Sequence, residues 1–312
     1  MPLWKQLLTP SIVFPNLRDV VFVGLGFVQS IVKLLRYRPD VVFTKGGFVC
    51  LPVGYAAALL NIPLVIHDSD AHPGLTNRLL AKYATVIGTG SPLEYYSYPQ
   101  EISHYVGIPV DASFTPRSAD EKRAIKQQLG FDESYPLTVI TGGGLGAVRI
   151  NNAVLASLDE LTRVSSVLLL SGKAQYEELR TRAAGSDRFK LEAFISHGMA
   201  DILGAADVVI ARAGATTLLE LAAVAAPTII IPNGLLTGGH QLKNAKVYED
   251  AGAVVVLEEN VLEKDPLLLA QNVIELLGSN EKRARMSTAF AQFARPEAAK
   301  DMARLIVAAI RK

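Results

Sequence analysis

The 312-residue sequence has one cysteine, almost no net charge and few histidines, and each of these excludes a class of protein or site. Its single cysteine, Cys50, excludes a disulfide framework and a cysteine-ligated zinc site, and it fits a reducing compartment. Lys and Arg number 31 against 30 Asp and Glu, and this net charge of +1 argues against a nucleic-acid binder held by a broad basic field. The five histidines are scattered without an H-x-x-x-H pair, so we expect no catalytic metal.

A long apolar run is also missing, although the mean hydropathy of +0.26 is high. The most apolar early stretch, 20–28, is well short of the ~20 residues that a spanning helix needs, and no signal peptide is evident. This stretch continues into a predicted helix that ends on Lys33, Arg36 and Arg38. Such a helix can lie on an anionic membrane surface, or it can be a core helix with an ordinary basic C-terminus.

Short β-branched runs alternate with helical segments along most of the chain. Uninterrupted apolar strands between helices predict parallel strands buried on both faces, and therefore a doubly wound α/β fold that binds ligands beyond the strand C-termini. The first half supplies about four strands and the second half six, a complete sheet. The predicted strands are 40–44, 63–67, 85–89, 103–106, 137–141, 167–171, 189–194, 207–211, 228–232 and 253–257.

A polar run over 111–126 separates the two halves and is the predicted linker. Helical patterns follow the strands on both sides of it, and one of them predicts a continuous helix over 150–163. The other predicted helices are 74–83, 175–184, 215–225, 241–251, 266–277, 281–293 and 296–311.

A glycine-rich loop, Thr141–Ala147, follows a predicted strand and opens a predicted helix. Glycines there let backbone N–H groups approach a phosphate, which the positive end of the helix dipole also favours. The loop does not match the dinucleotide fingerprint G-x-G-x-x-G, and no acidic residue ends the next strand, so the pattern argues against a Rossmann dehydrogenase. A simple tight turn is the alternative.

The segment from Arg212 to Glu220 also links a strand to a helix, with small residues and two threonines at the helix start. Two helix starts that can hold phosphates, with one carboxylate behind them, suit a nucleoside diphosphate. The N-termini would bind the phosphates, and Glu220 would accept the ribose hydroxyls. The alternative is a capped helix with a solvent-facing glutamate.

Other polar loops follow predicted strands. The glycine-rich loop 232–241 ends in a His-Gln pair and suits a loop that closes on a ligand and orients sugar hydroxyls. In the first half, K-G-G at 45–47 follows one strand, and H-D-S-D at 67–70 follows the next, where a general base would lie. The alternative for Asp68 or Asp70 is a cap of the helix near Pro73.

Seven segments together resemble one family. They are P-D-V-V-F-T-K-G-G-F (39–48), I-P-L-V-I-H-D-S-D (62–70), G-L-T-N-R-L-L-A-K (74–82), V-G-I-P-V (106–110), G-G-G-L-G-A (142–147), A-A-D-V-V-I-A-R-A-G-A-T-T-L-L-E-L-A-A (205–223) and H-Q-L-K-N-A (240–245). In this order and spacing they are similar to the MurG-type N-acetylglucosaminyltransferases of glycosyltransferase family 28. The similarity covers essentially the whole chain from residue 35 onward.

The resemblance implies a GT-B fold, in which two Rossmann-like domains face a cleft and a C-terminal helix crosses back onto the first. It implies a first domain over 1–112, a UDP-sugar domain over 120–295 and a returning helix over 297–311. The family moves N-acetylglucosamine from UDP-N-acetylglucosamine to a muramoyl sugar on undecaprenyl pyrophosphate, at the cytoplasmic face of the inner membrane. It inverts the anomeric centre and needs neither a cofactor nor a catalytic metal.

Site residues follow from the resemblance by position. The predicted acceptor-binding residues are Gly46, Gly47, Asp70 and Asn77. Asp68 or His67 is expected to remove the acceptor proton, while the two helix N-termini stabilise the departing diphosphate. The predicted donor-binding residues, with Ile195 and Met199 at the uracil pocket, are Gly143, Gly144, Ile195, Met199, Gly214, Ala215, Thr216, Thr217, Glu220, His240 and Gln241.

The sequence departs from the family pattern at several positions. Gly144 replaces the serine of the glycine loop, His240 replaces the first residue of a Gln-Gln pair, and D-S-D at 68–70 replaces E-Q-N. Ile108 and Asp111 replace an asparagine and an arginine. Two alternatives therefore stay open: a non-catalytic nucleotide-sugar-binding protein, and a glycosyltransferase of the same fold with a different lipid-linked acceptor.

The family's opening strand and its G-G-T-G-G-H loop, whose histidine is a proposed catalytic group, have no counterpart in the sequence. We therefore expect the first sheet to lack its opening strands. A mis-assigned start, a fragment, or a split enzyme completed by a separate polypeptide would each account for this. Such a sheet would expose an edge and an apolar face for a partner to cover.

Overall fold

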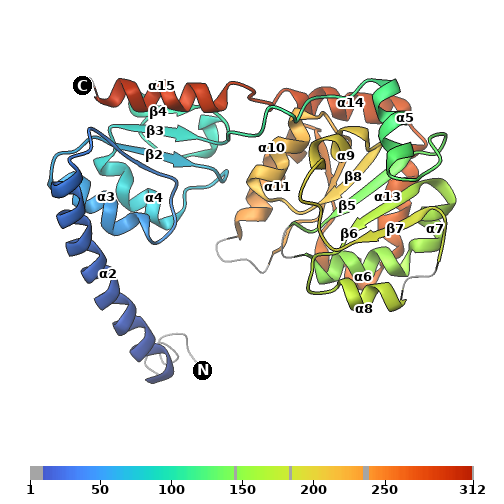
Figure 1. Ribbon diagram of the computed structural model, residues 1–312, viewed down its shortest axis with the longest axis horizontal. Helices are drawn as coiled ribbons and strands as arrows, with labels where there is room; N and C mark the ends of the chain where they lie inside the picture. The colour runs from blue at the N-terminus through green and yellow to red at the C-terminus, as the bar shows by residue number, and fades with distance from the viewer. Residues whose placement is uncertain (1–9, 144–145, 183–184, 235–238, 311–312) are drawn as a thin grey trace. The chain divides into compact units, whose positions relative to one another are not determined.

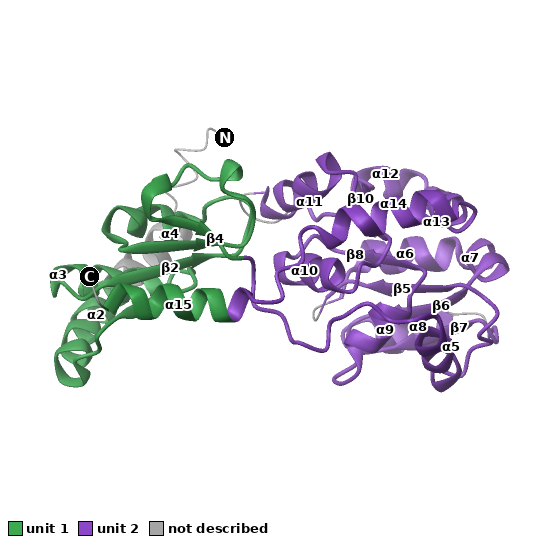
Figure 2. Ribbon diagram, turned by 90° about the horizontal axis from the view of Figure 1, so that it is seen from above, with its two compact units in different colours: residues 1–106, 300–312 green, residues 107–299 purple. Residues whose placement is uncertain are grey.

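The computed structural model describes residues 10–143, 146–182, 185–234 and 239–310, and it describes the backbone alone over 10–20. Two compact units make up the chain, as Figure 2 shows by colour. Unit 1 contains residues 1–106 and 300–312, and unit 2 contains residues 107–299. The division falls after Val106, whereas the sequence predicts the end of the first domain at residue 112.

Unit 1 is built on a parallel sheet of four strands in the order β1-β2-β3-β4. The central strands β2 and β3 are buried along their whole length, as the sequence pattern predicts for strands covered on both faces. β1 lies at an edge, and its middle residue, Phe43, is 41% exposed. The strands are β1 (Val42–Thr44), β2 (Leu64–Asp68), β3 (Val86–Thr89) and β4 (Ser103–Tyr105).

Helices cover the two faces of this sheet (Figure 1). On one face, Leu64 and Ile66 of β2 pack against apolar side chains of the helices that follow the strands. On the other face, Val65 packs with Met302 and Ala309 of the C-terminal helix. The helices of the first layer are α2 (Pro10–Tyr37), α3 (Cys50–Leu59) and α4 (Leu75–Leu80), which continues as a 3-10 turn over Ala81–Tyr83, and the second layer is α15 (Ala298–Ile310).

Unit 2 carries a parallel sheet of six strands in the order β10-β9-β8-β5-β6-β7. From β5 the chain adds β6 and β7 on one side, and it then returns to add β8 on the other side of β5. The C-terminal ends of β5 and β8 are therefore the switch point at which doubly wound sheets bind ligands. All six strands that the sequence predicts for this half are present. They are β5 (Leu137–Thr141), β6 (Ser166–Leu170), β7 (Phe189–Glu192), β8 (Val208–Ala211), β9 (Thr228–Ile230) and β10 (Val254–Val256).

Helices flank this sheet as well. Ile150, Leu161 and Val273 pack on Ile140 and Ile210 in one continuous core, while α5 and α9 lie against each other on the opposite side (Figure 2). The helices of unit 2 are α5 (Ala119–Gln128), α6 (Val148–Ala156), α7 (Leu158–Val164), α8 (Tyr176–Arg182), α9 (Met199–Ala205), α10 (Ala215–Ala223), α11 (His240–Asp250), α12 (Glu259–Lys264), α13 (Leu267–Leu277) and α14 (Asn280–Ala291).

The predicted linker over 111–126 is wrong in its second half, because α5 begins inside it. Ser118 is the N-cap residue: its hydroxyl accepts from the N–H of Glu121 at 3.3 Å, and the Glu121 carboxylate accepts from the N–H of Ser118 at 2.7 Å. This reciprocal capping box starts a helix despite the polar composition of the segment.

The continuous helix predicted over 150–163 is also wrong, because the segment forms two helices, α6 and α7, that meet at Ser157. Ser157 is fully buried and leaves the helical conformation, with φ −118° and ψ 19°. Its hydroxyl donates to the carbonyl of Ala153 at 2.7 Å. A serine that bonds the backbone of its own helix competes with the helical hydrogen bonds.

Candidate functional site

A pocket of about 140 Å³ opens beyond the C-terminal ends of β5, β6 and β7 in unit 2. It is lined by five of the predicted donor-binding residues: Gly143, Ile195, Met199, Thr217 and Glu220. These residues come from the loops after β5 and β7 and from α9 and α10, so the fold brings together positions far apart in the sequence. The pocket lies at the sheet edge where the fold class binds its ligands.

One aromatic residue of this pocket, Phe194, is not among the residues predicted from the sequence. Its side chain lines the pocket and is 52% exposed, and the Nζ of Lys173 lies 5.8 Å from the ring centroid. An open aromatic face at a pocket suits the stacking of a planar ring. The position of Phe194, directly before the predicted uracil residue Ile195, was the signal in the sequence.

Glu220 lies one turn into α10, on the same side as Thr217, and both line the pocket. Among the residues described, no donor or cation contacts the Glu220 carboxylate, and burial raises the pKa of Glu220. Half-burying a carboxylate without a partner costs free energy. A ligand with hydroxyl groups could donate the hydrogen bonds that this carboxylate does not receive from the described residues.

The glycine-rich loop after β5 is in part a tight turn. A Cβ on Gly146 would lie 2.4 Å from the carbonyl oxygen of Ser171, and one on Gly142 would lie 2.5 Å from the nitrogen of Ala147. Gly143 has φ +80°, has open space at its Cβ position and lines the pocket. Gly144, the other glycine predicted to bind the donor, lies outside the described residues.

Two helices begin beside these loops with N-termini that carry no side-chain cap. The N-cap residues of α6 and α10 are Ala147 and Gly214, and neither makes a side-chain capping hydrogen bond. Their first N–H groups therefore keep the capacity to bind an anion. Ala215 is the first residue of α10, and Thr216, which follows it, is exposed and does not line the pocket.

An ionic cluster centred on the buried Glu259, which we call the Glu259 bridge, joins the segments that carry these helix starts. Glu259 of α12 is 7% exposed and pairs with Arg212, which follows β8, and with Arg149 of α6 at 2.8 Å. Arg212 also donates to the carbonyl of Ile231 at 3.1 Å. The role of Glu259 could not be predicted, because nothing in the local sequence pattern links residues 149, 212 and 259.

α11 begins at the His-Gln pair, after Gly239 with φ 61°. The side-chain oxygen of Gln241 accepts from the N–H of Asn233 at 2.8 Å, and Asn244 donates to the carbonyl of Ala213 at 3.2 Å. These two bonds tie the start of α11 to the loops after β9 and β8. Neither His240 nor Gln241 lines the pocket that contains Glu220.

In unit 1, the predicted acceptor residues gather at the C-terminal ends of β1 and β2. Gly46 and Gly47 have φ of +81° and +79°, and a Cβ on Gly46 would lie 3.0 Å from the side-chain nitrogen of Asn77. Asn77 is 3% exposed, and its amide oxygen has no hydrogen-bond partner among the described residues. The structure therefore places Asn77 directly behind Gly46.

Asp68, a predicted general base, ends β2 and is 4% exposed. Its Oδ2 accepts a hydrogen bond of 2.6 Å from the hydroxyl of Tyr98. Burial raises the pKa of Asp68, and hydrogen bonds from Tyr98, Asn77 and the N–H of Gly74 oppose that rise. The bond to Gly74, the N-cap of α4, fits the capping alternative in part.

His67, the other predicted base, is fully buried, and its Nδ1 lies 3.2 Å from the hydroxyl of Ser69. Asp70 is partly exposed, and its carbonyl accepts a hydrogen bond of 2.7 Å from Tyr96. Tyr96 also accepts from the N–H of Ser91 at 3.1 Å. Neither tyrosine could be predicted from the sequence, because they lie 26 and 30 positions away from their partners.

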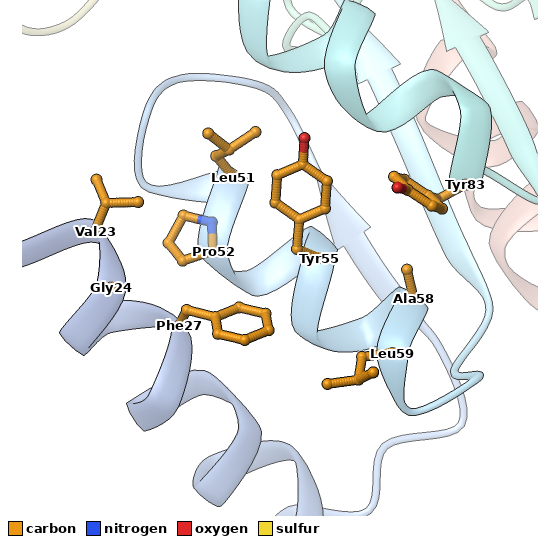
Figure 3. A pocket seen from close by; sticks show the side chains of 9 residues that line it. All are labelled: Val23, Gly24, Phe27, Leu51, Pro52, Tyr55, Ala58, Leu59 and Tyr83. Carbon is orange, nitrogen blue, oxygen red and sulfur yellow. The ribbon is translucent and has the colours of Figure 1, made fainter. Parts of the chain in front are cut away.

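Two apolar pockets of unit 1 lie along α2 and α3. One pocket of about 550 Å³ is lined by Val23, Phe27, Leu51, Tyr55 and Leu59 among others (Figure 3). A second pocket of about 790 Å³ combines apolar residues of the same two helices with Lys33. No helix in the described part of the chain is both long enough and apolar enough to cross a membrane.

The fold and the pocket define a class of protein: a GT-B protein with two parallel-sheet α/β units and a pocket at the switch point of the second. Comparison with known families then identifies the chain. The glycosyltransferase family 28 C-terminal domain matches residues 137–302, and the family 28 N-terminal domain matches residues 6–89. The chain belongs to glycosyltransferase family 28.

Two similar proteins from Bacillus species have the same name. The UDP-N-acetylglucosamine--N-acetylmuramyl-(pentapeptide) pyrophosphoryl-undecaprenol N-acetylglucosamine transferase of Bacillus pumilus is 35% identical over 291 residues, which cover 92% of this chain and 78% of that protein. The enzyme of the same name from Bacillus subtilis is 35% identical, over 84% of this chain and 72% of that protein.

Solved structures agree with the fold. MurG from Acinetobacter baumannii superposes with a TM-score of 0.74 at 26% identity, over 90% of this chain and 77% of that one. The UDP-GlcNAc 2-epimerase of Neisseria meningitidis, solved with UDP-GlcNAc bound, superposes with a TM-score of 0.66 at 12% identity, over 92% of this chain and 81% of that one. The second likeness concerns the fold alone.

Proposed function

We propose that this family 28 glycosyltransferase transfers N-acetylglucosamine from UDP-N-acetylglucosamine to a muramoyl sugar on undecaprenyl pyrophosphate, a step of peptidoglycan synthesis. The reaction is the one named for its relatives at 35% identity. The observation that carries the proposal is the pocket of unit 2, where Gly143, Ile195, Thr217 and Glu220 meet at the switch point.

The donor binds in unit 2. The uracil enters beside Ile195 and Met199, and the ribose hydroxyls donate to Glu220, which has no donor of its own among the described residues. The diphosphate lies against the uncapped starts of α6 and α10, whose dipoles favour negative charge. We infer that these helix starts stabilise the charge of the departing UDP, without a catalytic metal.

The acceptor binds in unit 1, at Gly46, Gly47, Asp70 and Asn77. Its hydroxyl oxygen attacks the anomeric carbon of the donor sugar while the bond from that carbon to the distal phosphate oxygen breaks. UDP leaves with the electron pair of that bond, and the hydroxyl proton passes to the carboxylate of Asp68. Attack opposite the leaving group inverts the anomeric centre.

The acceptor is a lipid, so the enzyme must meet a membrane surface. We propose that the face of α2 and α3 rests on an anionic leaflet. Phe22 and Phe48 are 60% and 78% exposed there, and Lys33 lies beside them in the larger apolar pocket. Apolar side chains next to basic ones are the arrangement that binds a protein in the headgroup region.

Calorimetric titration of UDP tests the donor site. We expect Glu220→Ala to weaken UDP about 10- to 100-fold, because charge-assisted hydrogen bonds are lost. Against a uridine diphosphate that lacks both ribose hydroxyls, the wild type and the variant should bind alike. Equal UDP affinities for the two proteins would overturn the ribose role of Glu220.

A product assay tests the reaction itself. Radiolabelled UDP-N-acetylglucosamine is incubated with the purified chain and a muramoyl pentapeptide on undecaprenyl pyrophosphate, and the lipid phase is counted. We expect label in the lipid phase that depends on the acceptor. UDP binding without transfer to this acceptor would overturn the proposed reaction and favour a binding protein or another acceptor.

A further inference from the structure

Two stacked tyrosines, Tyr96 and Tyr98, which we call the tyrosine pair, hold the loop that follows β2. Their rings lie 5.7 Å apart with an interplanar angle of 14°. Tyr98 donates to the carboxylate of Asp68 at 2.6 Å, whereas Tyr96 donates to the backbone carbonyl of Asp70 at 2.7 Å. Tyr98 therefore orients a side chain, whereas its neighbour Tyr96 bonds only to the backbone.

The bond between Tyr98 and Asp68 belongs to the strong class of hydrogen bonds. A separation of 2.6 Å is typical of a hydroxyl that donates to an ionised carboxylate. Both groups are buried, at 8% and 4% exposed, so little water competes for the bond. Burial, and then the charge of Asp68, raise the pKa of Tyr98, so the phenol keeps its proton throughout the pH range of an enzyme assay.

We propose that Tyr98 is a positioning residue of the acceptor site: its hydroxyl fixes the Asp68 carboxylate in the ionised form and orientation that take the proton of the acceptor hydroxyl. This inference rests on the proposed function. Tyr98 itself receives no proton. It acts through Asp68, whose carboxylate accepts the proton when the acceptor oxygen bonds to the anomeric carbon.

The groups around Asp68 set the direction of the effect. Burial raises the pKa of Asp68, and the hydrogen bond from Tyr98 lowers it more than that from Asn77 does. The nearby charge of Asp70 raises it, and the N–H of Gly74 lowers it. Tyr96 stacks behind Tyr98, and Arg78 faces Tyr98. Removal of the Tyr98 hydroxyl leaves a buried carboxylate with one donor fewer, so its pKa must rise.

The test compares Tyr98→Phe with Tyr96→Phe, two identical deletions in adjacent rings. For Tyr98→Phe we expect the acid limb of kcat/KM to move up by about one pH unit, because a lost hydrogen bond destabilises the ionised carboxylate. For Tyr96→Phe, which loses a bond to the backbone, the limb should stay at its wild-type pH. Asp68→Asn should lower kcat by at least about 100-fold, as loss of a general base does, with UDP affinity kept.

The experiment distinguishes a failure of the proposed function from a failure of the positioning role. A wild-type chain that forms no product overturns the proposed function before the variants are compared. An active wild type with the same acid limb in Tyr98→Phe overturns the positioning role. Equal shifts in the two tyrosine variants would assign the effect to loop packing, and would also overturn it. A thermal unfolding scan of each variant confirms that folded protein is compared.

Discussion

At the scale of single residues, the position of Glu220 in the pocket favours ligand binding but lowers the stability of the free protein. Its carboxylate is half-buried at the donor pocket, and among the described residues nothing donates to it. Burial holds the pKa of Glu220 above that of the unfolded chain. The ionised form therefore lowers the stability of the free protein at neutral pH, and a bound ribose recovers part of this cost.

This balance predicts a stabilising but damaging substitution. Glu220→Gln should raise the midpoint of thermal unfolding at pH 7 by about 2 °C, since about 1 kcal/mol moves a domain of this size by 2–4 °C. The gain should shrink as the pH falls, because the wild-type carboxyl then becomes neutral as well, and it should vanish below pH 4.5, the ordinary pKa of the group. Scanning calorimetry across this pH range, without UDP, measures it. A gain that does not change with pH would contradict the explanation.

Residues also mark the limits of inference from sequence. Thr217 and Glu220 could be predicted because they lie near the start of a helix that follows a strand, whereas Ile195 and Met199 were predicted from the family resemblance. Tyr98 could not be predicted, because its partner Asp68 lies 30 positions earlier and only the tertiary fold brings the two together. Glu259 is similar: it meets Arg149 across 110 positions.

At the scale of elements, the sequence pattern predicts strands better than helix boundaries. All ten predicted strands are present, and the central ones, such as β2 and β8, are buried along their whole length and read as apolar runs. The break between α6 and α7 depends on one buried hydroxyl, Ser157, which no periodicity reveals. The start of α5, by contrast, had a signal: S-x-x-E at 118–121 is a capping box.

The Glu259 bridge gives a prediction at this scale. Glu259→Gln leaves Arg212 and Arg149 without their buried counter-ion, so we expect a loss of about 3–5 kcal/mol in the free energy of unfolding of unit 2. Urea denaturation followed by circular dichroism measures it. The matched control is Glu263→Gln, which removes the 49% exposed partner of Arg149 and should cost less than about 1 kcal/mol. Similar losses of unfolding free energy in the two variants would contradict a stabilising role of the Glu259 bridge.

At the scale of the whole molecule, the proposed membrane face makes one measurable prediction. Lys33→Glu should weaken sedimentation with vesicles of phosphatidylglycerol by at least about 5-fold, since each basic residue near an anionic surface contributes about 1 kcal/mol. Binding to phosphatidylcholine vesicles should change little.

The control for this prediction is Lys264→Glu, which makes the same charge change on an exposed residue of α12 in unit 2. It should bind phosphatidylglycerol vesicles as the wild type does. Equal losses in the two variants would point to net charge rather than to the face of α2 and α3.

The packing of α15 on the first sheet has a consequence for biosynthesis. Val65, Val86 and Val106 are covered by Met302 and Ala309, so residues translated after the whole of unit 2 complete the core of the first unit. Unit 2 holds its whole core within 107–299 and can fold as soon as that stretch has left the ribosome. The sheet of unit 1 is therefore synthesised before unit 2 but is covered only after it, and until then one apolar face of that sheet is open to chaperones.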